Sequence, residues 1–233
     1  SSAWIDNAVA RWHAFVAKNG DSPNLSQIIG INPYSGLDVA ELGGDSNVLS
    51  FRYGTGFVPH QHKWMGVDPT ITEEKAARLY YLYNAQWINV DGTGVGAGVA
   101  PHLIKDHKVT AYNIKVQSSP DPDQMSEEMK ELGDFYSVRD QMLWQLREWL
   151  RLDTAACLPP CPLLRSQMLA LTYKKEPKRG RIKVTDSDTI REKVGKSPDE
   201  LMSLALTFAP QPEWEDLTLN VDNYAGFKSK KGK

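Results

Sequence analysis

The chain has 233 residues, of which 41% are hydrophobic and 24% charged, the composition of a globular domain with enough apolar side chains for a sizeable core. No apolar run reaches the roughly 18 residues that a membrane helix needs, and no signal-peptide pattern opens the chain, so we expect an intracellular protein without a membrane partner. The formal net charge is −2, so bulk charge does not indicate a nucleic-acid binder.

The first third of the chain predicts two helices and two strands. Residues 3–18 place apolar side chains near helical spacing, which predicts an amphipathic helix that ends at the following Asn-Gly pair. Residues 27–32 and 47–53 are predicted strands, the second with alternating apolar residues. Residues 72–84 begin with a threonine that suits an N-cap and are predicted to be helical.

In the rest of the chain strands and helices alternate. Strands are predicted over 86–91, 109–116 and 181–185, and helices over 125–132, 136–152 and 188–208. The last helix is interrupted before Pro198, with Ser197 as a suitable N-cap and Pro198 at the first helical position. The alternation predicts a mixed α/β domain.

Positive charge concentrates in the segment KKEPKRGRIK, residues 174–183. It carries Lys174, Lys175, Lys178, Arg179, Arg181 and Lys183 against a single acid, Glu176. Basic clusters bind phosphates even in a protein that is near neutral overall. Phosphate binding and a solvated hairpin are equally good interpretations. For the basic tail at residues 227–233, a solvated end is the better one.

Two acidic residues lie in the segment between residues 36 and 49. Asp38 stands amid apolar residues, where a buried carboxylate is costly unless it is paired or binds a metal. A functional and a structural role remain equally open for it. Asp45 follows two glycines and suits a simple turn.

Asp91 ends the predicted strand 86–91 and is followed by glycines that allow a tight turn. Sites in open α/β sheets form beyond the carboxyl ends of strands. Aspartates at two strand ends suit hard cations such as Mg²⁺ or Mn²⁺, and two such ions promote phosphodiester hydrolysis.

Two other interpretations compete for these residues. Gly92, Gly94 and Ala97 fit a loose dinucleotide-binding pattern, although the next strand offers no acid for a ribose hydroxyl. His60 and His62 lie on one side of an extended segment and could bind a metal, but such a pair is more often a surface loop feature.

Four segments, in this order, resemble the nuclease domain of phage terminase large subunits. They are GLDVAELGGDSNVLSFRYG, INVDGTGVGAGV, FYSVRDQMLWQLREWL and IREKVGKSPDELMSLALTF, within residues 36–208. The resemblance implies a ribonuclease H-like fold, a central mixed β-sheet flanked by helices. It also implies one or two Mg²⁺ or Mn²⁺ ions as cofactor and an endonuclease that cuts concatemeric double-stranded viral DNA during genome packaging.

The resemblance also implies roles for single residues. Asp38 corresponds to the metal ligand on the first strand and Asp91 to the second catalytic ligand, and residues 174–183 lie where the family has a hairpin near its DNA-binding face. Where the family has its third acidic ligand, this sequence has Met202, and a thioether does not replace a hard oxygen ligand. We hypothesise that Asp199, one helical turn earlier, partly substitutes as a catalytic metal ligand, with Asp45 assisting. The simpler alternative, slightly favoured, is that Asp199 only caps its helix.

The resemblance divides the chain at residues 25 and 210. Residues 1–25 are expected to connect to an ATPase domain of the same full-length chain, 26–210 to form the nuclease domain, and 211–233 to form a basic extension. The implied partners are double-stranded DNA, portal protein and the small terminase subunit, in the host cytoplasm at the procapsid portal.

Two alternatives to a nuclease with little sequence specificity stay open. One is a catalytically weak packaging module that binds DNA or portal protein. The other is a dinucleotide-binding α/β enzyme. Backbone contacts by basic residues such as Lys178, Arg179 and Arg181 carry no sequence information, so the nuclease is expected to tolerate many sequences.

Overall fold

The structure is a computed structural model that describes residues 1–20, 25–40, 45–65, 68–125, 127–132, 134–152 and 154–210. Its centre is a five-stranded sheet in the order β3-β2-β1-β4-β5. The strands are β1 (Tyr34–Asp38), β2 (Asn47–Arg52), β3 (His62–Trp64), β4 (Trp87–Asp91) and β5 (Ala111–Ile114). The pairs β1–β2 and β2–β3 are antiparallel, whereas β1–β4 and β4–β5 are parallel. The predicted mixed sheet of an α/β fold is therefore confirmed.

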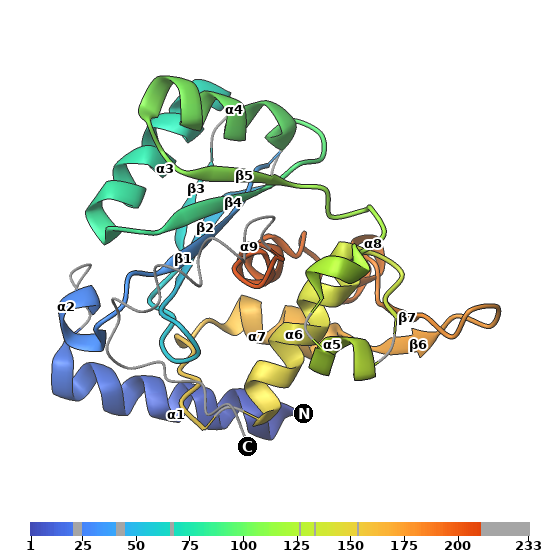
Figure 1. Cartoon of the computed structure of the whole chain (residues 1–233). Coiled ribbons are helices and arrows are strands. Elements are labelled where there is room, and N and C mark those ends of the chain that lie inside the picture. Colours follow the sequence, from blue (N-terminus) through green and yellow to red (C-terminus); the bar gives the residue numbers. More distant parts are fainter. Residues whose placement is uncertain are drawn as a thin grey trace, which may run out of the picture.

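Helices cover both faces of this sheet (Figure 1). On one face α3 (Pro69–Tyr83) packs against α4 (Gly96–His107), which contacts β4 and β5. On the other face α9 (Asp199–Leu206) lies against β1 and β2, and α6 (Val138–Leu152) and α7 (Pro162–Ala170) pack against α9. Two large apolar clusters result, one on each side of the sheet.

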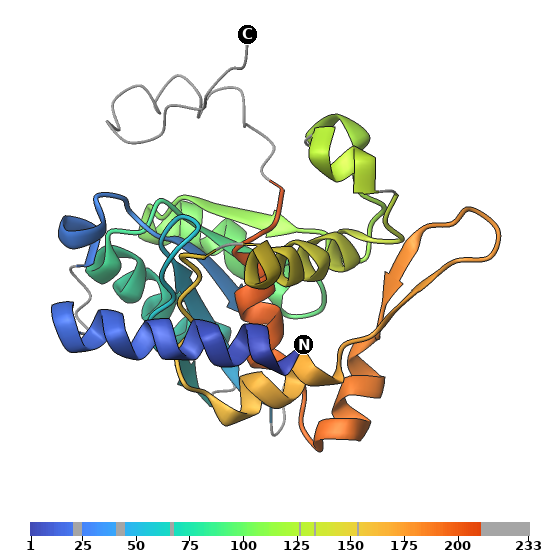
Figure 2. The ribbon, with the colours of Figure 1, turned by 90° about the horizontal axis from the view of Figure 1, so that it is seen from below.

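The remaining elements surround this core. The N-terminal helix α1 (Ser2–Asn19) contacts α6, and its Ile5 and Ala8 are buried there. The strands β6 (Tyr173–Lys175) and β7 (Ile182–Val184) form a hairpin that projects from the body and is followed by α8 (Ser187–Val194) (Figure 2). The short elements are α2 (Ser26–Ile29), the 3-10 helix η2 (Pro122–Gln124) and α5 (Glu127–Leu132). In the described part of the chain, no helix combines the length and apolarity needed to cross a bilayer.

Several sequence predictions need correction. Residues 27–32 were expected to be a strand, but the structure has the helix α2, which ends at Gly30 with a φ of 83°. A short apolar run does not distinguish a strand from a buried helical turn, so periodicity alone misassigned it. The predicted helix 72–84 begins earlier, because Asp68 caps it by accepting a hydrogen bond from the Thr70 amide. Thr72 is buried and accepts a hydrogen bond from Trp64 Nε1.

The close approach of α9 to the sheet depends on one glycine. A Cβ at Gly36 would press against the carbonyl oxygen of Ser203 and lie 2.7 Å from Leu206 Cβ. The Ser203 hydroxyl donates to the Gly36 carbonyl at 2.8 Å, and Asn89 Nδ2 donates to the Leu206 carbonyl at 2.8 Å. These bonds hold α9, and with it Asp199, in place over β1 and β4.

We therefore expect Gly36→Ala to destabilise the protein by about 1–3 kcal/mol, the range for overpacking a tight core. Gly98→Ala is the matched control, because nothing lies within 4 Å of its new Cβ on α4 and alanine favours a helix. Urea unfolding of both variants measures the difference. Equal stability of the two variants would contradict the close packing of α9 on β1.

Candidate active site

A cavity of about 550 Å³ opens at the carboxyl ends of β1 and β4. Leu37 on β1 is in register with Val90 on β4, so the next residues, Asp38 and Asp91, end neighbouring parallel strands side by side. Both aspartates line the cavity, as do Asp45 and Asp199. The fold thus gathers the four predicted carboxylates around one space.

Asp38 and Asp91 lie in an environment that disfavours their charged forms. Burial raises the pKa of Asp38 well above its ordinary value, and the negative charges of Asp91, Asp199 and Asp45 raise it further. Burial also raises the pKa of Asp91. Hydrogen bonds from the Thr93 amide at 3.0 Å and hydroxyl at 2.8 Å to Asp91 Oδ1 oppose that rise, and so does the charge of Arg139.

Asp199 lies in the first turn of α9 and faces the same cavity. Its Oδ2 accepts a hydrogen bond from the Ser46 amide at 3.1 Å, which ties the helix to the beginning of β2. Burial raises the pKa of Asp199, whereas its hydrogen bonds from Ser197 and Ser46 lower it. The helix begins one residue later than predicted, with Pro198 at the N-cap position and no side-chain cap.

Asp45 lies at the rim and is already paired. Arg191 Nη2 on α8 is 2.6 Å from Asp45 Oδ2, and the two side chains are 52% and 43% exposed. Met202 lines the cavity wall one helical turn after Asp199 and is buried. Its thioether adds no hard oxygen to the site.

The donor set fits a hard divalent cation. The four aspartates supply only carboxylate oxygens, the ligands that Mg²⁺ and Mn²⁺ prefer. Within the described residues, no three His, Cys, Asp or Glu side chains are already gathered tightly enough to form a finished metal cluster. Carboxylates that share a cavity repel one another, which adds to the effect of burial in raising the pKa of Asp38 and of Asp199. A bound cation would offset this repulsion.

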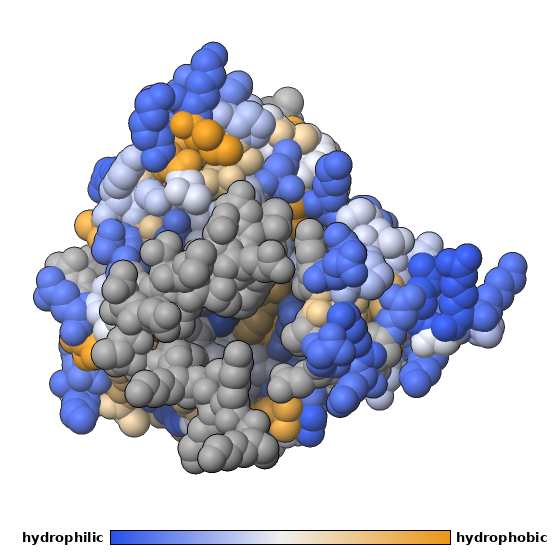
Figure 3. All heavy atoms as spheres, viewed as in Figure 1, coloured by the Kyte–Doolittle hydropathy of each residue, from blue (hydrophilic) through white to orange (hydrophobic). Residues whose placement is uncertain are grey.

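The predicted DNA-binding residues all lie on the β6–β7 hairpin. Lys174, Lys175, Lys178 and Arg179 are exposed. Figure 3 shows hydrophilic side chains over this projecting part of the molecule. Arg181 is partly engaged, since its Nε is 2.8 Å from Glu176 Oε2 and its guanidinium lies over the Tyr136 ring, as does the Lys183 ammonium. The hairpin therefore offers a mostly free set of cations beside the body.

The competing interpretations have structural explanations. A Cβ at Gly92 would lie 2.5 Å from Asn113 Oδ1, and one at Gly96 would press on the Asp91 carbonyl oxygen. Gly94 has a φ of 54°, a left-handed conformation that favours glycine. Close packing and this turn conformation thus account for the glycines without a dinucleotide. His62 Nε2 lies 2.9 Å from the Tyr83 hydroxyl, and His60 packs against Trp12. Both histidines belong to aromatic contacts.

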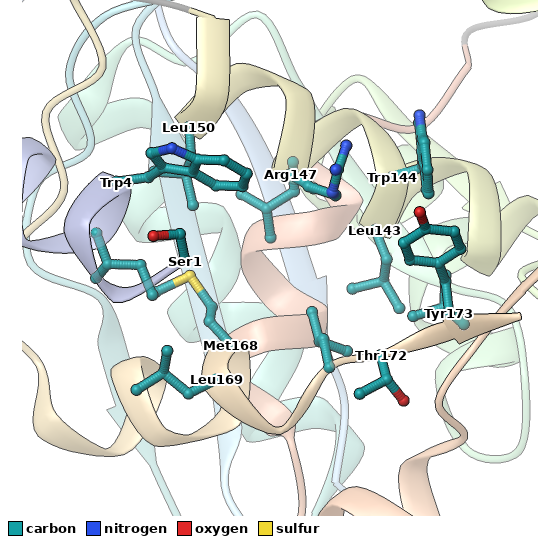
Figure 4. A pocket seen from close by; sticks show the side chains of 14 residues that line it. Ser1, Trp4, Leu143, Trp144, Arg147, Leu150, Met168, Leu169, Thr172 and Tyr173 are labelled. Carbon is teal, nitrogen blue, oxygen red and sulfur yellow. The ribbon is translucent and has the colours of Figure 1, made fainter. Parts of the chain in front are cut away.

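A second cavity, of about 410 Å³, lies between α1, α6, α7 and β6 (Figure 4). Its walls are mostly apolar, and Arg147 lies over the rings of Trp4 and Trp144. The described residues that line it include no carboxylate. Metal-dependent chemistry therefore has no ligands there, and the acidic cavity is the candidate site.

Comparison with solved structures identifies the fold. No family model matches the sequence, and no curated protein matches it. The structure superimposes on the nuclease domain of the large terminase subunit gp2 of bacterial virus Sf6 with a TM-score of 0.69 and 18% identity, over 89% of this chain and 96% of that domain. The chain has the fold of a phage terminase nuclease domain.

Two further terminase nuclease structures were solved with metals. A mutant Sf6 domain with manganese gives a TM-score of 0.67 at 19% identity, over 89% of this chain and 97% of that one. The large terminase nuclease from thermophilic phage G20c with bound magnesium gives 0.52 at 17% identity, over 76% and 80%. Divalent cations of the expected kind thus occur in proteins of this fold.

The sequence interpretation missed two cationic residues of the cavity, Arg139 and Arg191. Each lies on a helix whose sequence alternates charged and apolar residues, so each has the pattern of a solvated helix face. Only the tertiary structure, in which α6 packs against α9 and α8 against α7, brings both arginines to the cavity that the carboxylates line. The sequence holds no local signal for either.

Proposed function

We propose that the chain is the nuclease domain of a phage terminase large subunit, which cuts double-stranded concatemeric DNA during genome packaging with little sequence specificity. The observation that carries the proposal is the pair Asp38 and Asp91 at neighbouring strand ends, in one cavity with Asp199. The terminase nuclease fold supports it. Portal protein, the small subunit and an ATPase domain as partners, and the host cytoplasm as location, belong to the same proposal.

In this proposal Asp38 and Asp91 are the principal metal ligands. Asp199 is the third carboxylate, and Asp45 becomes available when Arg191 releases it. These carboxylates would hold divalent ions, whose positive charge would make water a better nucleophile and offset the charge on the departing 3′ oxygen. Thr93 keeps the Asp91 carboxylate oriented toward the cavity through its two hydrogen bonds.

The direct test is nicking of supercoiled plasmid by the purified chain with Mg²⁺, with Mn²⁺ and with a chelator. We expect nicked and linear products with either metal and none with the chelator. Cutting that persists in the chelator would contradict the proposal. So would saturable dinucleotide binding without cutting.

Met202 supports a second candidate, a DNA-binding packaging module with a weakened nuclease site. The residue occupies the cavity wall where the family resemblance places an acid, and it offers no oxygen ligand. Duplex binding of normal strength without cutting in either metal, at high protein concentration, would favour this candidate over an active nuclease.

The hairpin gives a separate prediction about DNA binding. Changing the exposed Lys174, Lys175, Lys178 and Arg179 together to glutamine should flatten the dependence of log affinity on log salt by up to about 3.6, since each lost phosphate contact contributes about 0.9. Fluorescence anisotropy with two unrelated duplexes measures the slopes. We expect equal losses on both, because backbone contacts do not distinguish sequences. An unchanged slope would mean that the hairpin is only a solvated loop.

A further inference from the structure

Arg139 is a buried cation on the wall of the acidic cavity. It lies in the first turn of α6, is 6% exposed and lines the cavity with Asp91. Its positive charge lowers the pKa of Asp91, so the two side chains interact electrostatically. Neither the metal ligands nor the hairpin accounts for this arginine.

The hydrogen bonds of Arg139 leave much of its guanidinium unused. Nη2 donates to the Thr185 carbonyl at 2.9 Å, and Nε has no hydrogen-bond partner among the described residues. Nη1 is 3.9 Å from Asp140 Oδ1, too far for a hydrogen bond. That oxygen already accepts from the Val184 amide at 2.9 Å, and Asp140 Oδ2 accepts from Ser137. A guanidinium has five N–H donors, so Arg139 has spare capacity.

Leaving this charge under-satisfied is costly. A buried ion loses its hydration and needs hydrogen-bonded partners to compensate, and burial accordingly lowers the pKa of Arg139. An acceptor anion at the cavity wall that Arg139 lines would compensate this charge. The guanidinium fork matches a phosphate group in geometry and charge.

Arg191, the other arginine among the described cavity residues, is less suited to this role. It is half exposed at the rim and engaged with Asp45 at 2.6 Å. Arg139 is deeper, and the Thr185 carbonyl fixes its orientation.

We propose that Arg139 contacts the phosphodiester group of the DNA in the cavity, donating hydrogen bonds to a non-bridging phosphate oxygen beside Asp38 and Asp91. The inference rests on the proposed function and adds a substrate-binding residue to it. A purely structural alternative exists, in which Arg139 only holds the base of the hairpin through Thr185.

The test compares duplex binding by the unsubstituted chain, Arg139→Gln, Arg139→Lys and the control Arg165→Gln. Arg165 is also paired with an aspartate, Asp6, but lies on α7 outside the cavity. Affinity is measured by anisotropy over a series of salt concentrations in Ca²⁺, with a gel to verify that the duplex stays intact. A melting curve for each variant verifies folding.

We expect Arg139→Gln to reduce the salt slope by about 0.9, one phosphate contact, while Arg139→Lys and Arg165→Gln keep the full slope. With Mn²⁺, plasmid nicking by Arg139→Gln should fall about 100-fold. A slope unchanged in Arg139→Gln would overturn the inference. A fall in the slope equivalent to several phosphate contacts would also overturn the inference, because such a fall would mean that the whole hairpin is displaced. If Arg139→Gln does not fold, Arg139→Met takes its place as the uncharged variant. Loss of one contact in Arg139→Met then supports the inference, and a full slope in it overturns the inference.

The outcome for Arg139 is separable from the outcome for the nuclease. Duplex binding without plasmid cutting by the unsubstituted chain would sink the nuclease proposal, while the slopes would still decide the role of Arg139. No duplex binding at all would sink both.

Discussion

Replacing Asp38 or Asp91 by asparagine should lower metal-dependent plasmid nicking by about a thousandfold or more. Asparagine keeps the size of each side chain but removes the negative charge that would hold a divalent cation. A bound ion contributes several kcal/mol to stabilising transition-state charge, and about 4 kcal/mol corresponds to three powers of ten in rate. The register of β1 and β4 places both residues in one cavity, so either loss should be sufficient.

Two further variants make this experiment specific. Asp106→Asn removes an exposed carboxylate from α4, outside the cavity, and should leave nicking unchanged. Asp199→Asn should reduce it about 10- to 100-fold if Asp199 acts through a water or a neighbouring ligand. Full activity of folded Asp38→Asn would disprove the assigned site. Full activity of Asp199→Asn would leave this residue a structural tie to Ser46 alone.

The sequence predicted the principal pair because its signal is local. Asp91 ends an apolar strand before a glycine turn, and Asp38 stands in an apolar segment, so each stands out within a few residues of chain. The pattern of apolar residues did not predict the strand β1, because this strand has only five residues and includes Ser35 and Gly36. The family resemblance, not the pattern, identified it.

The rest of the site depends on tertiary packing. Asp199 reaches the cavity because α9 lies close on Gly36, a contact between residues more than 160 positions apart. The helix α4 was missed because glycines open it and Pro101 lies inside it, and both residues oppose helix formation in isolation. Arg139 and Arg191 look like surface residues until α6 and α8 are placed. Local rules therefore found the strand-end acids but not the cations that face them.

The stability of the protein should respond to pH and to metal in opposite ways at Asp38. The folded state raises the pKa of Asp38 above its ordinary value of 3.8, and the pKa values of Asp91 and Asp199 are raised as well. Between 3.8 and the raised values the folded protein binds more protons than the unfolded chain. The contribution of these groups to stability is therefore full below about pH 3.8 and is lost as the pH rises through the folded-state values.

In the metal-free protein, Asp38→Asn removes the loss of stability that occurs when Asp38 ionises in the folded state. With a chelator present, the variant should melt several degrees above the unsubstituted protein at pH 8. The difference should shrink as the pH falls below the ordinary pKa of 3.8, where Asp38 is protonated in both states. Asp106→Asn should show no such pH-dependent difference, since its carboxylate is exposed. Thermal melting across this pH range in a chelator measures both variants. A variant that melts lower than the unsubstituted protein at every pH would mean that Asp38 is held by favourable contacts and is not strained by its neighbours.

Adding metal should reverse the order. An ion that binds only the folded state at 100 times its Kd stabilises it by about 2.7 kcal/mol, and this gain requires the Asp38 carboxylate. At pH 8 with excess Mn²⁺ the unsubstituted protein should therefore melt above Asp38→Asn, although it melts below it in the chelator. The reversal follows from one cause, because the charged forms of Asp38, Asp91 and Asp199 destabilise the metal-free fold and stabilise the metal-bound one. If Mn²⁺ raised the melting temperature of both proteins equally, the cation would bind elsewhere. The destabilisation at Asp38 would then have no connection with metal binding.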